Sequence, residues 1–230
     1  MMCSLLESRD LAPIVKMKGE RRPNSVAVRS QEKCELTEEQ VLLVLEQLLG
    51  YMRGQRKHYL PFGKPLSSER VELMSRFFSP SLLSRIKVVQ LVNRRITAPS
   101  FCQEIRASGF PGLKEFTHGA SMTFEDVLVF NDKITDRLLF HALVRSVQFQ
   151  ALGLDRYTEL FVRAFLDRRL RFGVPLERHA FELDLKFAAD RKTPFSVEDE
   201  VRMRASEHHY ELASTHGPQT HGARARKGNR

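Results

Sequence analysis

Apolar residues recur at helical spacing from residue 41 onward, and this periodicity predicts a first amphipathic helix. Its start carries a capping-box pattern, because the side chains of Thr37 and Gln40 can each accept a hydrogen bond from a free backbone N–H of the first turn. The apolar positions of this segment are Val41, Leu42, Val44, Leu45, Leu48 and Leu49. The pattern continues to Gly50, and the helix can extend through Tyr51 to Arg56.

Shorter elements are predicted between this helix and the middle of the chain. Residues 67–78 have helical spacing, and we expect that helix to end before Ser79, because Pro80 disfavours the helical conformation of the residue before it. Residues 86–92 are rich in β-branched side chains and predict a strand. Residues 122–130 predict a second strand, whose residues on one face are Met122, Phe124, Leu128 and Phe130.

Three closely spaced helices are predicted in the second half of the chain. The first begins at Thr135 or Asp136 and ends at Gly153, and we expect it to be buried because apolar residues surround its axis. The second covers residues 155–172. The third begins at Pro175, since proline is tolerated in the first turn of a helix.

Length and composition predict one domain with an extension at each end. A chain of 230 residues, 42% of them hydrophobic, can form one well-buried core. We expect an irregular lead over residues 1–35, an α+β domain over 36–190, and a weakly ordered tail over 191–230 with a fraying helix at most. The end of that tail is basic and carries Arg224, Arg226, Lys227 and Arg230 without any acidic residue.

Composition also narrows the class of protein. Cys3, Cys34 and Cys102 are far apart and form no C-x-x-C pair, which argues against a disulfide framework or a cysteine-built zinc site. The sequence has neither a run of apolar residues long enough to span a bilayer nor an apolar signal segment, so we expect a cytoplasmic protein with no membrane association. The net charge of +9 favours loose attraction to polyanions.

The stretch F-H-A-L-V-R at residues 140–145 is close to a zinc-binding helix. In an H-E-x-x-H helix, two histidines four residues apart bind one zinc ion and the glutamate activates the metal-bound water. Here Ala142 occupies the glutamate position and Arg145 the second histidine position. Alanine cannot accept a proton, and a guanidinium has no lone pair for a metal, so the hydrolytic chemistry should be lost.

Residues 122–183 contain this stretch and later V-P-L-E-R-H-A-F-E-L, and together they resemble the core of gluzincin-type zinc metallopeptidases. They are especially similar to a poorly characterised bacterial family with the approximate pattern L-F-H-E-L-V-H-x-x-Q followed by P-L-E-x-x-A. The likeness extends over roughly residues 60–190. It implies a mainly helical α+β fold with a small sheet packed on the active-site helix, then a connecting helix and a glutamate helix.

The resemblance also implies roles for individual residues. His141 matches the first zinc ligand and Glu177 the third, whereas Arg145 and Ala142 depart from the pattern; Gln148 and Pro175 match it. We expect no cofactor at this vestigial metal site. Arg145 can instead pair with Glu177, because the anionic ligand would otherwise lack a partner.

A simpler interpretation of the same residues also stands. A lone buried histidine is more often a core residue with satisfied hydrogen bonds than a metal ligand, and a glutamate in the first turn of a helix is favoured by the helix dipole. On this interpretation His141 and Glu177 have no shared function.

Three functions are compatible with the sequence. The first is a catalytically inactive, metallopeptidase-like binding or scaffold module with an unidentified protein or peptide partner. The second is an active zinc hydrolase with atypical ligands, namely His118, His141 and Glu177. The third is binding of nucleic acid or another polyanion through the basic tail. Four histidines in the tail are either a loose metal-binding tract, as histidine-rich segments form, or an accident of composition, which is the commoner case. They are His208, His209, His216 and His221.

Overall fold

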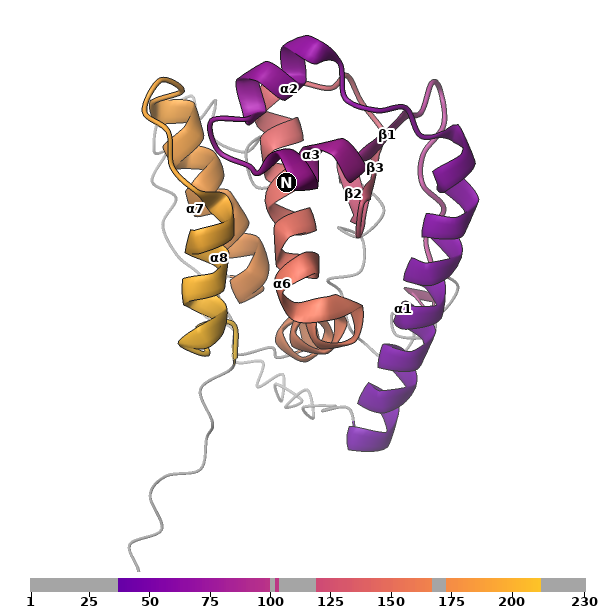
Figure 1. Ribbon diagram of the computed structural model, residues 1–230. Helices are drawn as coiled ribbons and strands as arrows, with labels where there is room; N and C mark the ends of the chain where they lie inside the picture. The colour runs from indigo at the N-terminus through magenta and orange to yellow at the C-terminus, as the bar shows by residue number, and fades with distance from the viewer. Residues whose placement is uncertain (1–36, 100–101, 104–118, 167–172, 212–230) are drawn as a thin grey trace, which may run out of the picture.

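The computed structural model describes residues 37–99, 102–103, 119–166 and 173–211. Over these residues the fold is α+β and mainly helical, with one small sheet (Figure 1). The elements are α1 (Glu38–Tyr59), η1 (Leu60–Phe62), α2 (Ser68–Met74), α3 (Pro80–Arg85), β1 (Lys87–Gln90), β2 (Ser121–Phe124), β3 (Val127–Phe130), α6 (Asp136–Leu166), α7 (Pro175–Ala189) and α8 (Val197–Ser206). The expected fold class is therefore confirmed, while the gluzincin core stays a prediction. The expected lead over residues 1–35 and the basic end of the tail lie outside the described residues.

The first helix begins with the expected capping box. The Thr37 hydroxyl accepts a hydrogen bond from the backbone N–H of Gln40 at 3.3 Å, and the Gln40 side chain accepts one from the N–H of Thr37 at 2.9 Å. The helix continues to Tyr59, beyond the expected Arg56, and Pro61 then lies in the short 3₁₀ turn η1. Its core-facing side chains are Val44, Leu48, Met52 and Tyr59.

Strand β3 is the centre of the sheet and supplies side chains to two hydrophobic cores. It pairs in parallel with β1 and antiparallel with β2. Because side chains alternate along a strand, Val127 and Val129 enter the core shared with α1, whereas Leu128 and Phe130 enter the core shared with α6 and α7. All four side chains are fully buried.

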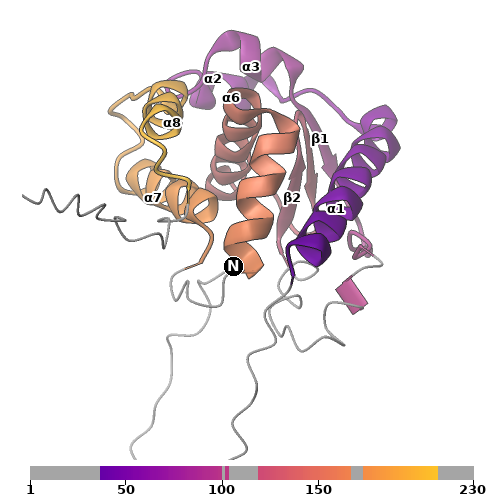
Figure 2. The ribbon, with the colours of Figure 1, turned by 90° about the horizontal axis from the view of Figure 1, so that it is seen from below.

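The elements form layers on either side of this sheet. Figure 2 shows α1 on one side of the strands and α6 on the other, with α7 and α8 beyond α6. Helix α6 bends at Gly153, whose φ of 75° and ψ of 159° interrupt the helix where the sequence predicts an end. In the part of the chain that the structure describes, no helix combines the length and apolar character needed to cross a bilayer.

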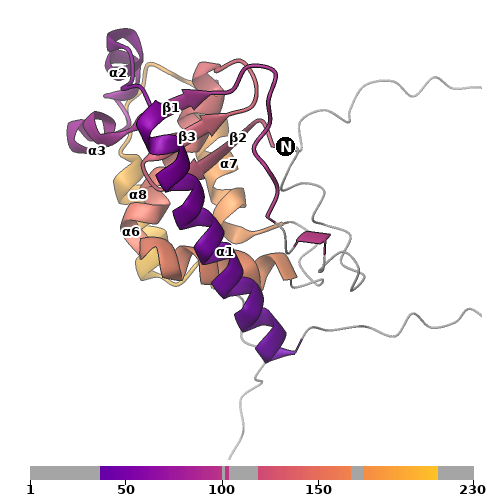
Figure 3. The same ribbon diagram turned by 90° about the vertical axis from the view of Figure 1, so that its right-hand side faces the viewer.

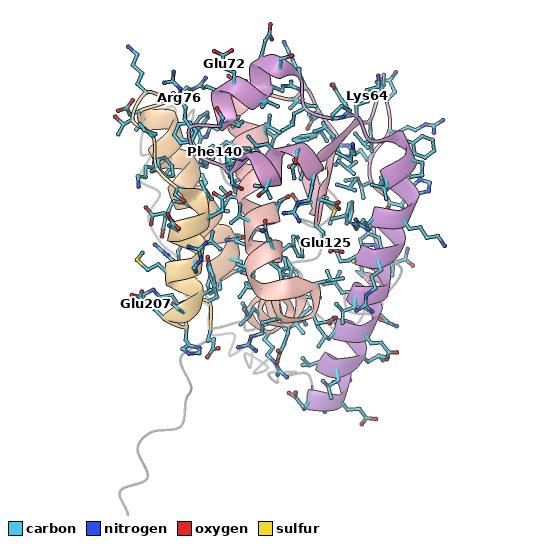
Figure 4. All side chains as sticks on the ribbon, viewed as in Figure 1. Lys64, Glu72, Arg76, Glu125, Phe140 and Glu207 are labelled. Carbon is cyan, nitrogen blue, oxygen red and sulfur yellow. The ribbon has the colours of Figure 1, made fainter. Side chains whose placement is uncertain are left out.

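The sequence prediction of a single strand over residues 122–130 is wrong. Glu125 has a φ of 58° and lies in the turn between β2 and β3, so the segment is a tight hairpin. The two apolar strands look like one continuous strand in the sequence because the residues between them, Glu125 and Asp126, are weaker turn formers than an asparagine–glycine pair. The hairpin lies against α6 (Figure 4), where the Ser146 hydroxyl donates to the carbonyl oxygen of Glu125 at 2.6 Å.

Helix α3 was not predicted from the sequence. Pro80 was expected only to end the preceding helix, yet it occupies the first turn of a new one. Ser79 is its N-cap, and the Ser79 hydroxyl accepts a hydrogen bond from the N–H of Leu82 at 3.3 Å.

The expectation of a weakly ordered tail from residue 191 is wrong for residues 191–211. Helix α8 buries Val197 and Val201 completely, although its other residues are mostly polar. Two hydrogen bonds join its start to the turn before α3: the N–H of Val197 donates to the carbonyl of Phe77 at 3.0 Å, and the N–H of Ser79 to Glu198 Oε1 at 2.8 Å. The apolar density of this segment is low, but two buried side chains one turn apart are enough to bind the helix to the core.

Replacing Val201 by alanine should lower the free energy of unfolding by about 2 kcal/mol, because it leaves a cavity in a fully buried site. Met203→Ala on the same helix is the matched control and should change stability by less than about 0.5 kcal/mol, since Met203 is 49% exposed. Urea unfolding of both variants measures the difference. Equal effects would show that α8 is not part of the core.

Candidate functional site

His141, Arg145 and Glu177 meet where α6 packs against α7. His141 and Arg145 lie one turn apart on α6, and Glu177 lies in the first turn of α7. The Arg145 guanidinium Nη2 donates to Glu177 Oε2, and the two residues form an ion pair. His141 Nε2 lies 3.7 Å from the same carboxylate oxygen. The fold therefore brings together the three residues that the resemblance grouped.

These side chains are largely but not fully buried. The exposed fractions are 17% for His141, 19% for Arg145 and 31% for Glu177. Arg145 Nε is buried and finds no hydrogen-bond partner among the described residues. The pair is therefore held by one guanidinium nitrogen, in an environment where a charge is costly to leave unpaired.

The electrostatics of the site favour a charged Glu177 and a neutral His141. Burial by itself would raise the pKa of the Glu177 carboxyl, but the charge of Arg145 and the contact with His141 outweigh it and lower that pKa to about 2. Burial, followed by the positive charge of Arg145, lowers the pKa of His141. Since the Glu177 pKa is depressed, its contribution to stability is present above about pH 4.5 and is lost as the pH falls towards 2.

Neighbouring residues of the motif support the contact between the two helices. Gln148 is fully buried and its Nε2 donates to the Leu176 carbonyl at 3.0 Å, while Pro175 occupies the first turn of α7. Ala142, at the position of the general base, is completely buried, and its carbonyl accepts a hydrogen bond from the Thr123 hydroxyl at 3.3 Å. A glutamate at 142 would therefore have to enter the core.

The donor set does not suit a catalytic zinc ion. Such a site uses three protein ligands and an open position, whereas only His141 and Glu177 offer donor atoms here. Arg145 occupies the remaining direction and uses the Glu177 oxygen that a metal would need. Across the described ranges, no group of three or more histidine, cysteine, aspartate or glutamate side chains is placed to hold a metal ion. His118, the third ligand of the atypical zinc site, lies outside those ranges.

Two residues near the site were not singled out by the sequence. Tyr157 is almost fully buried, and burial, together with the charge of Glu177, raises the pKa of its hydroxyl, which stays protonated beside the pair. Arg137, one turn before His141, donates through Nε to both carboxylate oxygens of Asp184 at 2.9 Å. The i, i+4, i+8 spacing of Arg137, His141 and Arg145 on α6 was a signal available in the sequence.

A second buried polar contact lies on another face of α7. His179 is 1% exposed, and its Nδ1 lies 2.6 Å from the hydroxyl oxygen of Tyr210. Burial, followed by the charge of Arg204, lowers the pKa of His179 to about 4. The imidazole is thus a neutral core group that connects α7 to the residues after α8.

The structure describes two of the four tail histidines, His208 and His209. His208 Nδ1 lies 3.0 Å from Glu211 Oε1, and His209 Nδ1 lies 3.2 Å from Glu207 Oε2. His216 and His221 lie outside the described residues.

No protein-family model, curated protein or solved structure matches this chain.

A double-mutant cycle of Arg145→Met and Glu177→Gln should give a coupling energy of about 1–3 kcal/mol in the free energy of unfolding, because the pair is largely buried. Chemical denaturation at pH 7 measures it. The exposed pair Arg53–Asp155, with side chains 60% and 75% exposed, is the control and should give less than about 0.5 kcal/mol. Similar coupling in both pairs would mean that burial adds nothing at the site.

Replacing His179 by phenylalanine should flatten the dependence of stability on pH between about 6.5 and 4. In this range the unfolded chain binds a proton that the folded His179 does not, so the wild type loses up to roughly 3 kcal/mol as the pH falls. Urea unfolding at several pH values measures the slope. His58→Phe, at an exposed position on α1, is the matched control variant. An unchanged slope in His179→Phe would contradict the assignment.

Proposed function

We propose that this protein is a non-hydrolytic relative of zincin-type metallopeptidases, in which an ion pair replaces the metal ion, and that it acts as a binding or scaffold module for a protein or peptide. The observation that supports this proposal is the contact of Arg145 with the same Glu177 oxygen that faces His141. The cation performs the neutralising role that zinc would have, but it brings no activated water.

The spacing of the two retained ligands supports a metal-binding ancestry. A tetrahedral zinc ion with ligands about 2.1 Å away keeps two donor atoms about 3.4 Å apart. His141 Nε2 and Glu177 Oε2 are 3.7 Å apart, which a small side-chain movement would correct. A histidine at position 145 would point in the same direction as His141, because the two positions are one turn apart.

Loss of hydrolysis follows from the same residues. The buried Ala142 supplies no base, and the cation at 145 opposes a second positive charge only a few ångströms away. A fold that keeps its architecture without these groups can still present a surface to a partner. The proposal therefore assigns the chain to binding rather than to catalysis.

The test replaces Arg145 by histidine and measures zinc binding. Arg145→His should bind close to one zinc ion per chain and gain thermal stability with zinc, because it restores three ligands, while the wild type should bind no stoichiometric zinc. Equilibrium dialysis with metal analysis gives the stoichiometry, and thermal unfolding with zinc or chelator gives the stability.

The control is the double variant His141→Ala with Arg145→His, which should lose the site because it has only two ligands. Stoichiometric zinc in the wild type would contradict the proposal in favour of an atypical metallohydrolase. A folded Arg145→His variant that binds no zinc would contradict the metal-binding ancestry.

A further inference from the structure

The outer face of α1 exposes two large apolar side chains. Leu42 and Leu43 are 51% and 53% exposed, opposite the buried face of the same helix. In Figure 3 this helix runs along the side of the molecule that faces the viewer. No described element packs over this face, so neighbouring leucines here are a candidate contact surface.

Charges are ordered along the same face. Glu39 and Glu46 lie in its N-terminal half and Lys57 in its C-terminal half, all three exposed. None of the three has an ion-pair partner among the described residues, whereas other charges of α1 are paired within the chain, such as Arg56 with Asp126. An acidic half and a basic half on one helix complement a second copy of that helix placed antiparallel to it.

The shape of this face of α1 also suits a second helix, because two of its exposed positions are glycines. Gly50 and Gly54 are exposed, and a Cβ atom added at either position would have no atom within 4 Å in the described structure. Glycine lowers helix stability, so two of them in an exposed helix need a reason. Without side chains, they leave room for the side chains of an adjacent helix.

We propose that the chain forms a two-fold symmetric dimer in which α1 packs antiparallel against α1 of a second copy. A two-fold axis at the level of residue 48 places Glu39 opposite Lys57 of the other copy, and Leu42 at the level of Gly54 along the helix axis. Glu39 then meets Lys57 at both ends of the interface, and Gly50 and Gly54 leave room near the leucines of the other copy. Antiparallel helix dipoles also attract.

A second copy is favoured over an unrelated partner because both halves of the complementarity occur on one helix. An unrelated partner would be recognised by either the acidic half or the basic half alone, so it does not explain why both occur on one helix. The proposal uses no residue of the Arg145–Glu177 site, so it does not depend on the proposed function.

Sedimentation velocity of the full chain over a range of concentrations tests the proposal. The wild type should show a concentration-dependent monomer–dimer equilibrium that weakens with salt, because the Glu39–Lys57 contacts are exposed. Glu39→Lys and Lys57→Glu should each raise the dissociation constant about tenfold, since each creates like-charge contacts at two symmetric places. The double variant Glu39→Lys with Lys57→Glu should restore wild-type affinity, which only antiparallel pairing predicts.

Apolar variants provide an independent readout. Leu42→Lys should raise the dissociation constant about a hundredfold, whereas Leu185→Lys, at a 46% exposed position on α7, should leave it unchanged. Circular dichroism and thermal unfolding confirm that each variant folds. A wild type that stays monomeric at all concentrations overturns the proposal, as does a dimer that none of the α1 variants weakens or that the double charge exchange fails to restore.

Discussion

The carboxylate of Glu177 is the constraint on which the packing of α6 against α7 depends. It lies in the first turn of α7, largely removed from water, so it requires a positive partner nearby. Arg145 supplies that charge from α6, while Gln148 binds the Leu176 carbonyl next to it and Arg137 pairs with Asp184 further along. The two helices are thus joined at three levels by polar contacts.

Apolar packing places these polar contacts in register. Phe140 of α6 stacks on Phe187 of α7 with ring centroids 4.3 Å apart. Phe140 also contacts Phe77 and Phe78, which precede α3, with ring centroids 5.6 and 5.1 Å away. Because the rings fix the relative height of the helices, the guanidinium and the carboxylate need little side-chain adjustment to meet.

Local signals account for what could be predicted from the sequence. The capping box at Thr37, the break at Gly153 and the helix start at Pro175 each depend on residues within one turn, and each is present in the structure. The hairpin and α8 were missed for the opposite reason: the turn at Glu125 has a weak local signal, and α8 is stabilised by contacts with distant residues such as Phe77. The contact between His179 and Tyr210 could not be predicted for the same reason, because the two residues are 31 positions apart in the sequence.

The sequence by itself determined the starts of α1 and α7, the break in α6, the α+β class and the presence of an acid at position 177 and a cation at position 145, because periodicity, caps and charges are local properties. It could not decide whether His141, Arg145 and Glu177 meet, since α6 and α7 are joined by a connection whose path local rules do not fix. Only the tertiary structure placed the cation on the carboxylate, because neutralising a buried charge depends on distance in space. The tertiary structure also decides that the outer face of α1 is exposed, because no other described element packs against that face.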